Sequence, residues 1–321
     1  MAVLQIVGNQ SRSGKTSLAA ALLTLANTAG RKAAYYKPFS GAAGADSDAT
    51  FITQLLQPYG GPAVPDSGDQ ANSGDAAVLA QVQNAIAKLE SQAGLVIIEG
   101  PDGSEPLPLD SKVILVHRYS RQAGVDAVKA SIAAAGPNLA AVVVNAVPIH
   151  RRDEVARDLG GQTVPLAVIP ESRGMLSVSV AQLAEHLGGQ WVLDPVNTDA
   201  PVERFMIGGN IMDEGPTYFG RYSNQAVITR VERPDIQMAC MSDRTSCLVL
   251  TGPGEPRAYI KAEALERELP LIQVRTNTHD TAESLAGLLE KPNHLTPAKA
   301  DCFAGLLMAY LGGEAVEQLV G

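Results

Sequence analysis

The stretch Gly8-Asn9-Gln10-Ser11-Arg12-Ser13-Gly14-Lys15-Thr16 decides how the rest of this chain is organised. An apolar run at 3–7 comes directly before it, and an alanine- and leucine-rich segment at 17–23 follows it. The order is therefore strand, glycine-containing loop and helix. Small residues in such a loop let backbone N–H groups close around phosphate oxygens, and the start of the helix favours negative charge. The stretch predicts a phosphate-binding loop, or P-loop, rather than an ordinary glycine turn before a helix.

The polar residues of this loop have predicted roles. Lys15 reaches the terminal phosphates of a nucleotide, and the Thr16 hydroxyl ligates Mg²⁺. ATP and Mg²⁺ are therefore the cofactors that we expect. The remaining predicted nucleotide contacts in the loop are Gly8, Ser13, Gly14 and Ser17.

The spacing of the loop glycines resembles that of one family. Five residues separate Gly8 from Gly14, whereas the common pattern has four. The longer gap is similar to that of dethiobiotin synthetase and its relatives, the cobyrinic acid amidating synthetases. Gln10 occupies the position where the partition-protein branch of P-loop proteins has an extra lysine. Three further segments resemble this family: residues 36–41 followed by Asp46 and Asp48, residues 95–100, and residues 142–148.

The resemblance implies carboxylates on the metal side of the site. Glu99 ends an apolar strand at the position of the acidic residue that holds Mg²⁺ directly or through water in P-loop proteins. An ordinary exposed carboxylate is the alternative. Asp48 matches a further metal-side carboxylate, and Asp46 is close enough to take that role, although a helix N-cap at Asp46 or Ser47 is the alternative there. The predicted Mg²⁺ ligands are Thr16, Asp48 and Glu99.

Two more residues have implied roles at strand ends. Lys37 follows a short strand and precedes Pro38, so we expect its ammonium to point toward the crevice. The matching lysine of dethiobiotin synthetase helps to bind the carboxylated substrate amine and the developing phosphate charge. Lys15 and Lys37 are thus the predicted catalytic residues, with a solvated lysine as the alternative for Lys37. Asn145 offers one acceptor and two donors to an adenine edge, and capping the next loop is its alternative role.

The segment after Glu99 departs from the synthetase pattern. Where that family has a glycine-rich run, this chain has Gly100-Pro101-Asp102-Gly103-Ser104-Glu105. We expect Asp102 and Glu105 to lie beside the metal and to repel a carboxylated, dicarboxylate-like substrate. The crevice is thus predicted to hold nucleotide and metal, without the substrate side of a biotin enzyme.

Composition narrows the class of partner. The chain has 321 residues, of which 45% are apolar and 18% charged, and this length allows two domains with separate cores. A net charge of −9 argues against a nucleic acid or an anionic membrane as the main partner. No window approaches ~18 uninterrupted apolar residues and no secretory pattern opens the chain, so we expect a cytoplasmic protein. The three cysteines lack C-x-x-C spacing, which predicts buried free thiols.

Residues 1–190 are predicted to form a P-loop domain of the α/β class. Apolar β-branched runs alternate with helical stretches, which is typical of a parallel sheet with helices on both faces. The predicted strands are 2–8, 32–36, 95–99, 112–116, 141–145 and 165–169. The predicted helices are 15–29, 47–57, 75–92, 121–135, 150–159 and 177–187. Residues 57–74 are rich in Pro, Gly, Asp and Ser and are predicted to be a surface loop.

Residues 202–321 are predicted to form a second, smaller α/β domain after a polar linker at 190–201. The predicted strands are 203–208, 225–230, 246–251 and 270–275, and the predicted helices are 234–242, 258–268 and 280–290. Asp280 with Glu283 has the spacing of a capping box, and Thr296 before Pro297 predicts the start of a terminal helix. The apolar cluster on that helix is Leu306, Leu307, Tyr310 and Leu311.

Residues 203–290 resemble a DRTGG domain. The similarity lies in residues 206–209, 232–237, 248–252 and 271–274, although Pro253 stands where a second glycine is usual. Arg233 is placed to meet an anionic ligand or only to help cap a helix with Asp235, and Thr251-Gly252 forms a ligand notch or a turn. A synthetase-like domain followed by a DRTGG domain resembles the non-catalytic N-terminal region of long phosphotransacetylases, and residues 170–177 also resemble the end of its first domain.

These resemblances imply an ATP- and Mg²⁺-binding regulatory or sensor protein with an unidentified small-molecule effector. The alternative is an ATP-dependent ligase, similar to dethiobiotin synthetase, that activates a carboxylate or carbamate by phosphorylation. A scaffold with a vestigial loop is a third interpretation, disfavoured because Lys15, Thr16 and Glu99 are all present. The resembling synthetases are dimeric, so we expect a homodimer.

Overall fold

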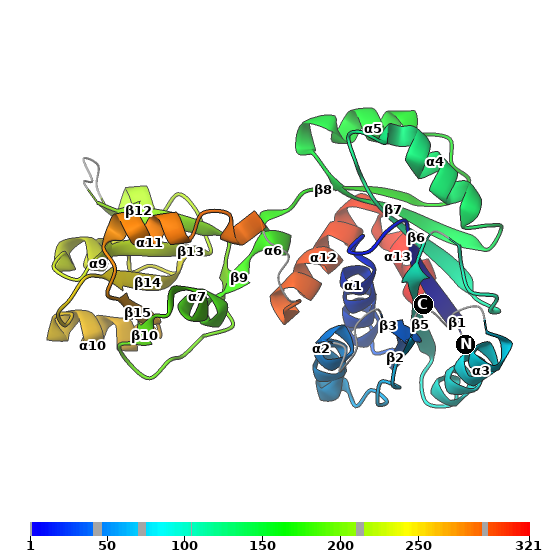
Figure 1. Cartoon of the computed structure of the whole chain (residues 1–321), viewed down its shortest axis with the longest axis horizontal. Coiled ribbons are helices and arrows are strands. Elements are labelled where there is room, and N and C mark those ends of the chain that lie inside the picture. Colours follow the sequence, from blue (N-terminus) through cyan, green and yellow to red (C-terminus); the bar gives the residue numbers. More distant parts are fainter. Residues whose placement is uncertain (1, 41–46, 70–74, 104, 210–214, 291–294) are drawn as a thin grey trace. The chain divides into compact units, whose positions relative to one another are not determined.

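A computed structural model describes residues 2–40, 47–69, 75–103, 105–209, 215–290 and 295–321 (Figure 1). The chain forms two compact units. The first comprises Met1–Ser172 together with Lys299–Gly321, and the second comprises Arg173–Ala298.

The first unit is built on a six-stranded sheet with the order β2-β5-β1-β6-β7-β8. All neighbouring strands in it are parallel. The strands are β1 (Ala2–Gly8), β2 (Ala33–Tyr36), β5 (Leu95–Asp102), β6 (Lys112–Arg118), β7 (Leu139–Val147) and β8 (Leu166–Pro170). Each coincides with a predicted strand, and the predicted fold class is confirmed. Because β1 lies between β5 and β6, the loop that follows Gly8 emerges between the ends of two neighbouring strands.

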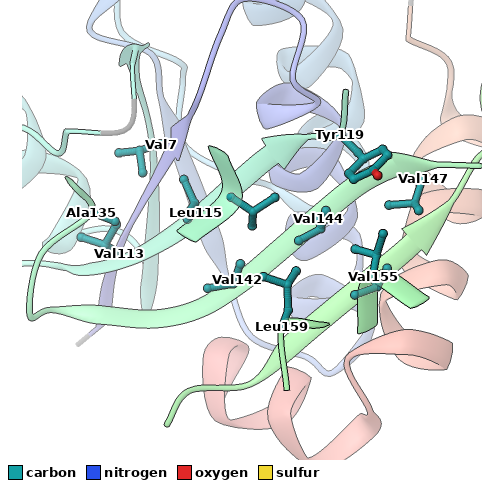
Figure 2. Close-up of a cluster of buried hydrophobic side chains, with 12 residues drawn as sticks. Val7, Val113, Leu115, Tyr119, Ala135, Val142, Val144, Val147, Val155 and Leu159 are labelled. Atoms are coloured by element: carbon teal, nitrogen blue, oxygen red, sulfur yellow. The ribbon is translucent and has the colours of Figure 1, made fainter. Parts of the chain in front are cut away.

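One face of this sheet packs against the helices α3 (Ala76–Glu90), α4 (Gly124–Ala134) and α5 (Arg152–Asp158). Figure 2 shows the cluster that β1, β6 and β7 contribute, with Val7, Leu115, Val142 and Val144 among its labelled side chains. Each such side chain, when fully buried, stabilises the fold by about 1.5–3 kcal/mol relative to exposure. This packing fixes the strand ends that carry the polar residues.

Helix α1 (Lys15–Thr28) is buried along most of its length, with Leu18, Leu22 and Leu23 at most 1% exposed. Its contacts include β5, β2, α2 (Ser47–Leu56) and α13 (Gly313–Val320). A helix in this position needs small and apolar residues on several sides, which explains its run of alanines. The burial anchors the start of α1 beneath the loop.

The C-terminal helices α12 (Pro297–Tyr310) and α13 belong to the first unit. Arg31 donates hydrogen bonds to the carbonyl oxygens of Val320 and Gly321, and Arg152 stacks on the Tyr310 ring at 4.6 Å. The units therefore differ from the predicted domains of 1–190 and 202–321 at both boundaries. Cap signals locate where a helix begins but carry no information on the surface against which it packs. Leu307 is fully buried, so this helix packs within its own chain.

The second unit contains a five-stranded sheet with the order β10-β15-β14-β13-β12. Its strands are β10 (Gln190–Trp191), β12 (Arg204–Gly208), β13 (Gln225–Arg230), β14 (Thr245–Thr251) and β15 (Leu271–Val274). Strands β12 to β15 are parallel and β10 is antiparallel. The helices α8 (Gly215–Phe219), α9 (Pro234–Cys240) and α10 (Ala258–Glu266) cover one face, and α7 (Val180–Leu187) and α11 (Thr278–Ser284) cover the other.

Three local predictions need correction. The predicted linker contains β10, because Trp191 pairs with Ile272 at the sheet edge. Helix α11 begins earlier than predicted: Asn277, not Asp280, is its N-cap and accepts a hydrogen bond from the Asp280 N–H at 2.9 Å. The predicted surface loop at 57–74 includes β4 (Gly68–Asp69), which pairs in parallel with β3 (Phe39–Ser40).

Candidate functional site

The P-loop between β1 and α1 is shaped by its two glycines. Gly14 has a φ of 107°, in the left-handed region that favours glycine, and a Cβ there would lie 2.5 Å from Asn145 Nδ2. A Cβ on Gly8 would lie 2.2 Å from Ser13 Oγ. The loop can close only if both positions lack a side chain. The two glycines singled out in the sequence thus belong to a tightly folded loop.

Asn145 holds this loop from the end of β7. Its Nδ2 donates to the Ser13 carbonyl oxygen at 2.9 Å, and its Oδ1 accepts from the Ala146 N–H at 2.8 Å. Ala146 itself has a φ of 57°, so the side-chain bond supports an unusual backbone turn. The amide is engaged in positioning the loop, which is close to the alternative weighed from sequence, and adenine recognition by Asn145 stays a prediction.

Lys15 forms an ion pair with Asp102. The distance from Lys15 Nζ to Asp102 Oδ1 is 2.6 Å, and the exposed fractions of the two side chains are 7% and 38%. The contact arises because Gly8 pairs with Asp102 across β1 and β5, which places the end of β5 against the loop. Asp102 was expected beside the metal, and its role as the partner of Lys15 was not foreseen.

The three predicted Mg²⁺ ligands lie together. The Thr16 hydroxyl oxygen is 3.1 Å from Glu99 Oε1 and 3.2 Å from Asp48 Oδ2. Lys37 Nζ lies 2.8 Å from the same Asp48 oxygen, so both predicted catalytic lysines reach a carboxylate at the site. Asp46, the rival to Asp48, lies outside the described residues.

Glu99 is the most deeply buried carboxylate of the site, with 3% of its surface exposed. Burial raises the pKa of Glu99, and the positive charges of Lys37 and Lys15 and a hydrogen bond from Tyr35 act in the opposite direction. The Tyr35 hydroxyl donates to Glu99 Oε2 at 2.7 Å. The sequence gives no signal for Tyr35. Tyr35 pairs with Ile97 across β2 and β5, and Glu99 lies two residues further along β5, so the two side chains are on the same face of the sheet.

The donor set suits Mg²⁺ and a nucleotide phosphate. Mg²⁺ prefers carboxylate, hydroxyl and water oxygens, and Thr16, Asp48 and Glu99 supply the first two kinds. Ser13 Oγ is buried and has no hydrogen-bond partner among the described residues, so an unused polar group faces the interior of the loop. In the same described residues no group of three or more His, Cys, Asp or Glu side chains could hold a metal by itself. The predicted set instead consists of two carboxylates and a hydroxyl.

The sequence candidates in the second unit have partners within it. Arg233 forms a two-pronged ion pair with Asp235, with Nη2 to Oδ2 at 2.7 Å and Nε to Oδ1 at 2.9 Å. Thr251 Oγ1 lies 2.8 Å from Thr278 Oγ1, and the following Gly252 has a φ of 93°.

Among the described residues, no helix has the length and apolar character needed to span a bilayer.

Comparison with solved structures gives several distant likenesses. The CBS and DRTGG domains of the regulatory region of Clostridium perfringens pyrophosphatase, complexed with the activator diadenosine tetraphosphate, match at 14% identity and a TM-score of 0.31 over 46% of this chain and 72% of that one. Cobyrinic acid a,c-diamide synthase from Mycobacterium smegmatis, with a bound ATP analog and magnesium, matches at 17% identity and a TM-score of 0.35 over 53% of this chain and 84% of that one. The MobB protein homolog from Bacillus stearothermophilus matches at 19% identity and a TM-score of 0.28 over 52% and 86%. At these values the likenesses assign no activity to this chain.

The comparison with protein families gives a firmer result. Residues 182–288 match the family model of the DRTGG domain, and the whole match lies inside the second unit. The DRTGG resemblance expected from sequence is thereby confirmed for residues 182–288.

Proposed function

We propose that this protein is a regulatory or sensor protein that binds Mg²⁺–ATP at the P-loop of its first unit and a small-molecule effector in its DRTGG unit. The observation that carries the proposal is the convergence of Lys15, Thr16, Asp48 and Glu99 at the end of β1. These residues come from three separate segments of the chain: the junction of the loop with α1, helix α2, and strand β5. Their chemistry matches a phosphate and its metal ion.

Each side chain has a definite part in this proposal. The loop N–H groups and Lys15 hold the terminal phosphates, and the buried Ser13 hydroxyl is free to donate to a phosphate oxygen. Thr16, Asp48 and Glu99 hold Mg²⁺, which neutralises the charge that the phosphates and carboxylates would otherwise accumulate. Tyr35 fixes the orientation of Glu99 through its 2.7 Å hydrogen bond.

Two features support regulation rather than turnover. Asp102 forms an ion pair with the ammonium of Lys15, so an arriving phosphate must displace the Asp102 carboxylate. The P-loop unit is also joined to a DRTGG domain, a domain type that is part of the regulatory region of the Clostridium perfringens pyrophosphatase. The same order of units underlies the resemblance to the N-terminal region of long phosphotransacetylases, which we retain as part of the proposal.

The second candidate is an ATP-dependent ligase that activates a carboxylate or carbamate. The observation in its favour is Lys37, which lies 2.8 Å from Asp48 and therefore close to the metal ligands. In that mechanism Lys37 would stabilise the charge that develops on the transferred phosphoryl group. Phosphate release that a small acid or amine stimulates, and that Lys37→Ala abolishes, would establish this candidate instead.

Thermal unfolding of the full chain with and without Mg²⁺–ATP tests the leading proposal. A ligand at about 100 times its dissociation constant adds about 2.7 kcal/mol to the free energy of unfolding. Lys15→Ala should lose this stabilisation, whereas Lys32→Ala, which removes an exposed lysine of the same unit, should keep it. If millimolar Mg²⁺–ATP leaves the melting temperature of the wild-type chain unchanged, the proposed nucleotide site is wrong.

A further inference from the structure

The second unit has a cavity of about 430 Å³ at the carboxyl ends of β12 and β13. Its lining includes Gly208 at the end of β12 and the following Gly209, Arg230 at the end of β13, Arg233 before α9, and Asn277 and His279 at the start of α11. This volume lies within the range of about 300–1,000 Å³ that is usual for small-molecule sites.

The topology of the unit explains why a cavity forms there. Helix α9 packs on one face of the sheet through Ile236 and Cys240, whereas α11 leads to the opposite face, where Leu285 is buried. Two segments that leave the same edge of a parallel sheet toward opposite faces leave a crevice between them, and ligands of open α/β sheets bind in such crevices. A Cβ on Gly209 would meet no described atom within 4 Å, so among the described residues there is open space at this point of the lining.

Hydrogen-bond donors predominate in this cavity. Arg230 is exposed, and its guanidinium has no hydrogen-bond or ion-pair partner among the described residues. Arg233 uses Nε and Nη2 on Asp235, which leaves further N–H donors from its guanidinium. His279 adds an exposed imidazole.

Among the described residues, the carboxylates near the cavity are already engaged or lie away from its lining. Asp235 is held by Arg233, and Asp280 accepts a hydrogen bond from Asn277 Nδ2 at 2.9 Å. Glu232 is exposed and its carboxylate lies near Gly252, which is not part of the lining. Among the described residues, an anion in the cavity would therefore meet two positively charged guanidinium groups, of which only that of Arg233 is paired with a carboxylate.

We propose that this cavity binds the oxyanion of a small metabolite, a phosphate or a carboxylate, through Arg230 and Arg233. Guanidinium groups match both oxyanions because their planar N–H forks can pair with two acceptor oxygens at once. This inference gives the effector of the proposed regulatory function a binding site and a chemical class. It rests on that proposed function. Arg230 supplies the main contact, because its guanidinium can bind the anion without first releasing a carboxylate, whereas Arg233 is already paired with Asp235.

Calorimetric titration of the full chain tests the site with three probes: inorganic phosphate, AMP and succinate. The Lys15→Ala background prevents binding at the P-loop from contributing to the signal. At least one probe should bind, and adding Arg230→Gln should weaken it at least tenfold. Adding Arg257→Gln, which removes an exposed arginine of the same unit outside the cavity, should change the affinity less than twofold. Arg230→Lys should restore part of the affinity because it keeps the charge without the planar fork.

The outcomes separate this site from the nucleotide site. Binding of phosphate and AMP without succinate identifies a phosphorylated effector, and binding of succinate identifies a carboxylate. If no probe binds, or if Arg230→Gln and Arg233→Gln both bind the probe as the parent does, the cavity is not an oxyanion site. That result leaves the P-loop proposal intact when Mg²⁺–ATP still stabilises the wild-type chain. Melting of each variant without ligand checks that the fold is unchanged.

Discussion

The ammonium of Lys15 lies 2.6 Å from the carboxylate of Asp102, although Lys15 belongs to the loop that should bind phosphate. The Lys15 side chain is only 7% exposed, so Asp102 supplies the negative charge that this buried cation needs when no phosphate is present. The carboxylate therefore has the charge and the hydrogen-bonding partner that a terminal phosphate would have. Nucleotide binding at this loop requires the exchange of one anion for another.

Asp102→Asn should therefore increase the affinity for Mg²⁺–ATP. Partly exposed ion pairs contribute about 0.2–1 kcal/mol, and one that involves a buried lysine lies at or above the upper end, which corresponds to about a five- to tenfold gain. Glu105→Gln is the matched control, because it removes one exposed carboxylate from the same segment. Titration calorimetry measures both. A weaker affinity in Asp102→Asn would instead mean that Asp102 positions Lys15 for the phosphate.

Glu99 should make the stability of the ligand-free protein depend on pH. Burial raises the pKa of Glu99 in the folded state, so the folded chain binds a proton more tightly than the unfolded chain does. The resulting stabilisation is complete below the unfolded pKa and is lost as the pH rises through the raised folded pKa. Glu99→Gln should flatten this part of the profile and increase the free energy of unfolding at pH 7 without metal.

Denaturant titration between pH 4 and pH 8 measures this effect. Tyr35→Phe serves as a second variant, because loss of its hydrogen bond to the charged carboxylate should raise the pKa of Glu99 further. A profile that is the same for the wild-type chain and Glu99→Gln would contradict the assignment. The same Glu99→Gln variant should lose Mg²⁺-dependent nucleotide binding, since the amide brings no charge to the metal.

Asn145→Ala should weaken nucleotide binding by loosening the loop. The variant removes the hydrogen bond to the Ser13 carbonyl oxygen, and a bond of this kind contributes about 0.5–1.5 kcal/mol. Comparing ATP with GTP separates the two roles of this side chain. Equal losses for both nucleotides indicate that Asn145 only positions the loop, whereas a selective loss for ATP indicates that it also recognises adenine.

Local sequence predicted the fold and pointed to most of the residues that lie together in the candidate site. The order strand, glycine loop and helix is set by residues next to one another, so β1, the loop and α1 could be located from sequence with small errors at the ends. Asp48 and Glu99 could be proposed because each closes or follows a recognisable segment. The pattern of apolar runs likewise located the strands of the DRTGG unit.

The missed features depend on register or on long-range packing. Asp102 reaches Lys15 because β5 continues past Glu99 far enough for Asp102 to pair with Gly8. The apolar run that marks this strand in the sequence ends before Glu99, so it does not show that the strand extends to Asp102. Tyr35 reaches Glu99 only because β2 lies beside β5. The terminal helices join the first unit through Arg31, which lies far from them in sequence. Such contacts are decided by the tertiary structure, and composition gives no indication of them.

We expect the protein to form a homodimer, the commonest closed arrangement among soluble oligomers. Leu307 is already buried within its own chain, so the apolar cluster on α12 is not by itself the reason. Tyr310 and Met308 remain partly exposed on the same helix. Multi-angle light scattering at micromolar concentration should give twice the chain mass, and Met308→Glu should reduce it to that of the monomer if α12 lies in the interface. A monomer mass for the wild-type chain would contradict the expectation.

The sharpest test of the sensor proposal is coupling between the two ligands. If Mg²⁺–ATP and an oxyanion in the DRTGG unit bias the same equilibrium, each must change the affinity of the other by the same factor, because linkage is reciprocal. A typical coupling of about 1–3 kcal/mol corresponds to about a 5- to 150-fold change. Calorimetric titration of Mg²⁺–ATP into the full chain, with and without the oxyanion that binds best, measures it, and the reverse titration must agree. Arg230→Gln should remove the effect of the oxyanion on ATP while leaving the affinity for ATP alone unchanged, since Arg230 lies in the other unit. If both ligands bind and neither affects the other, the protein does not act as a sensor of this kind, and stimulated phosphate release that depends on Lys37 would then favour the ligase.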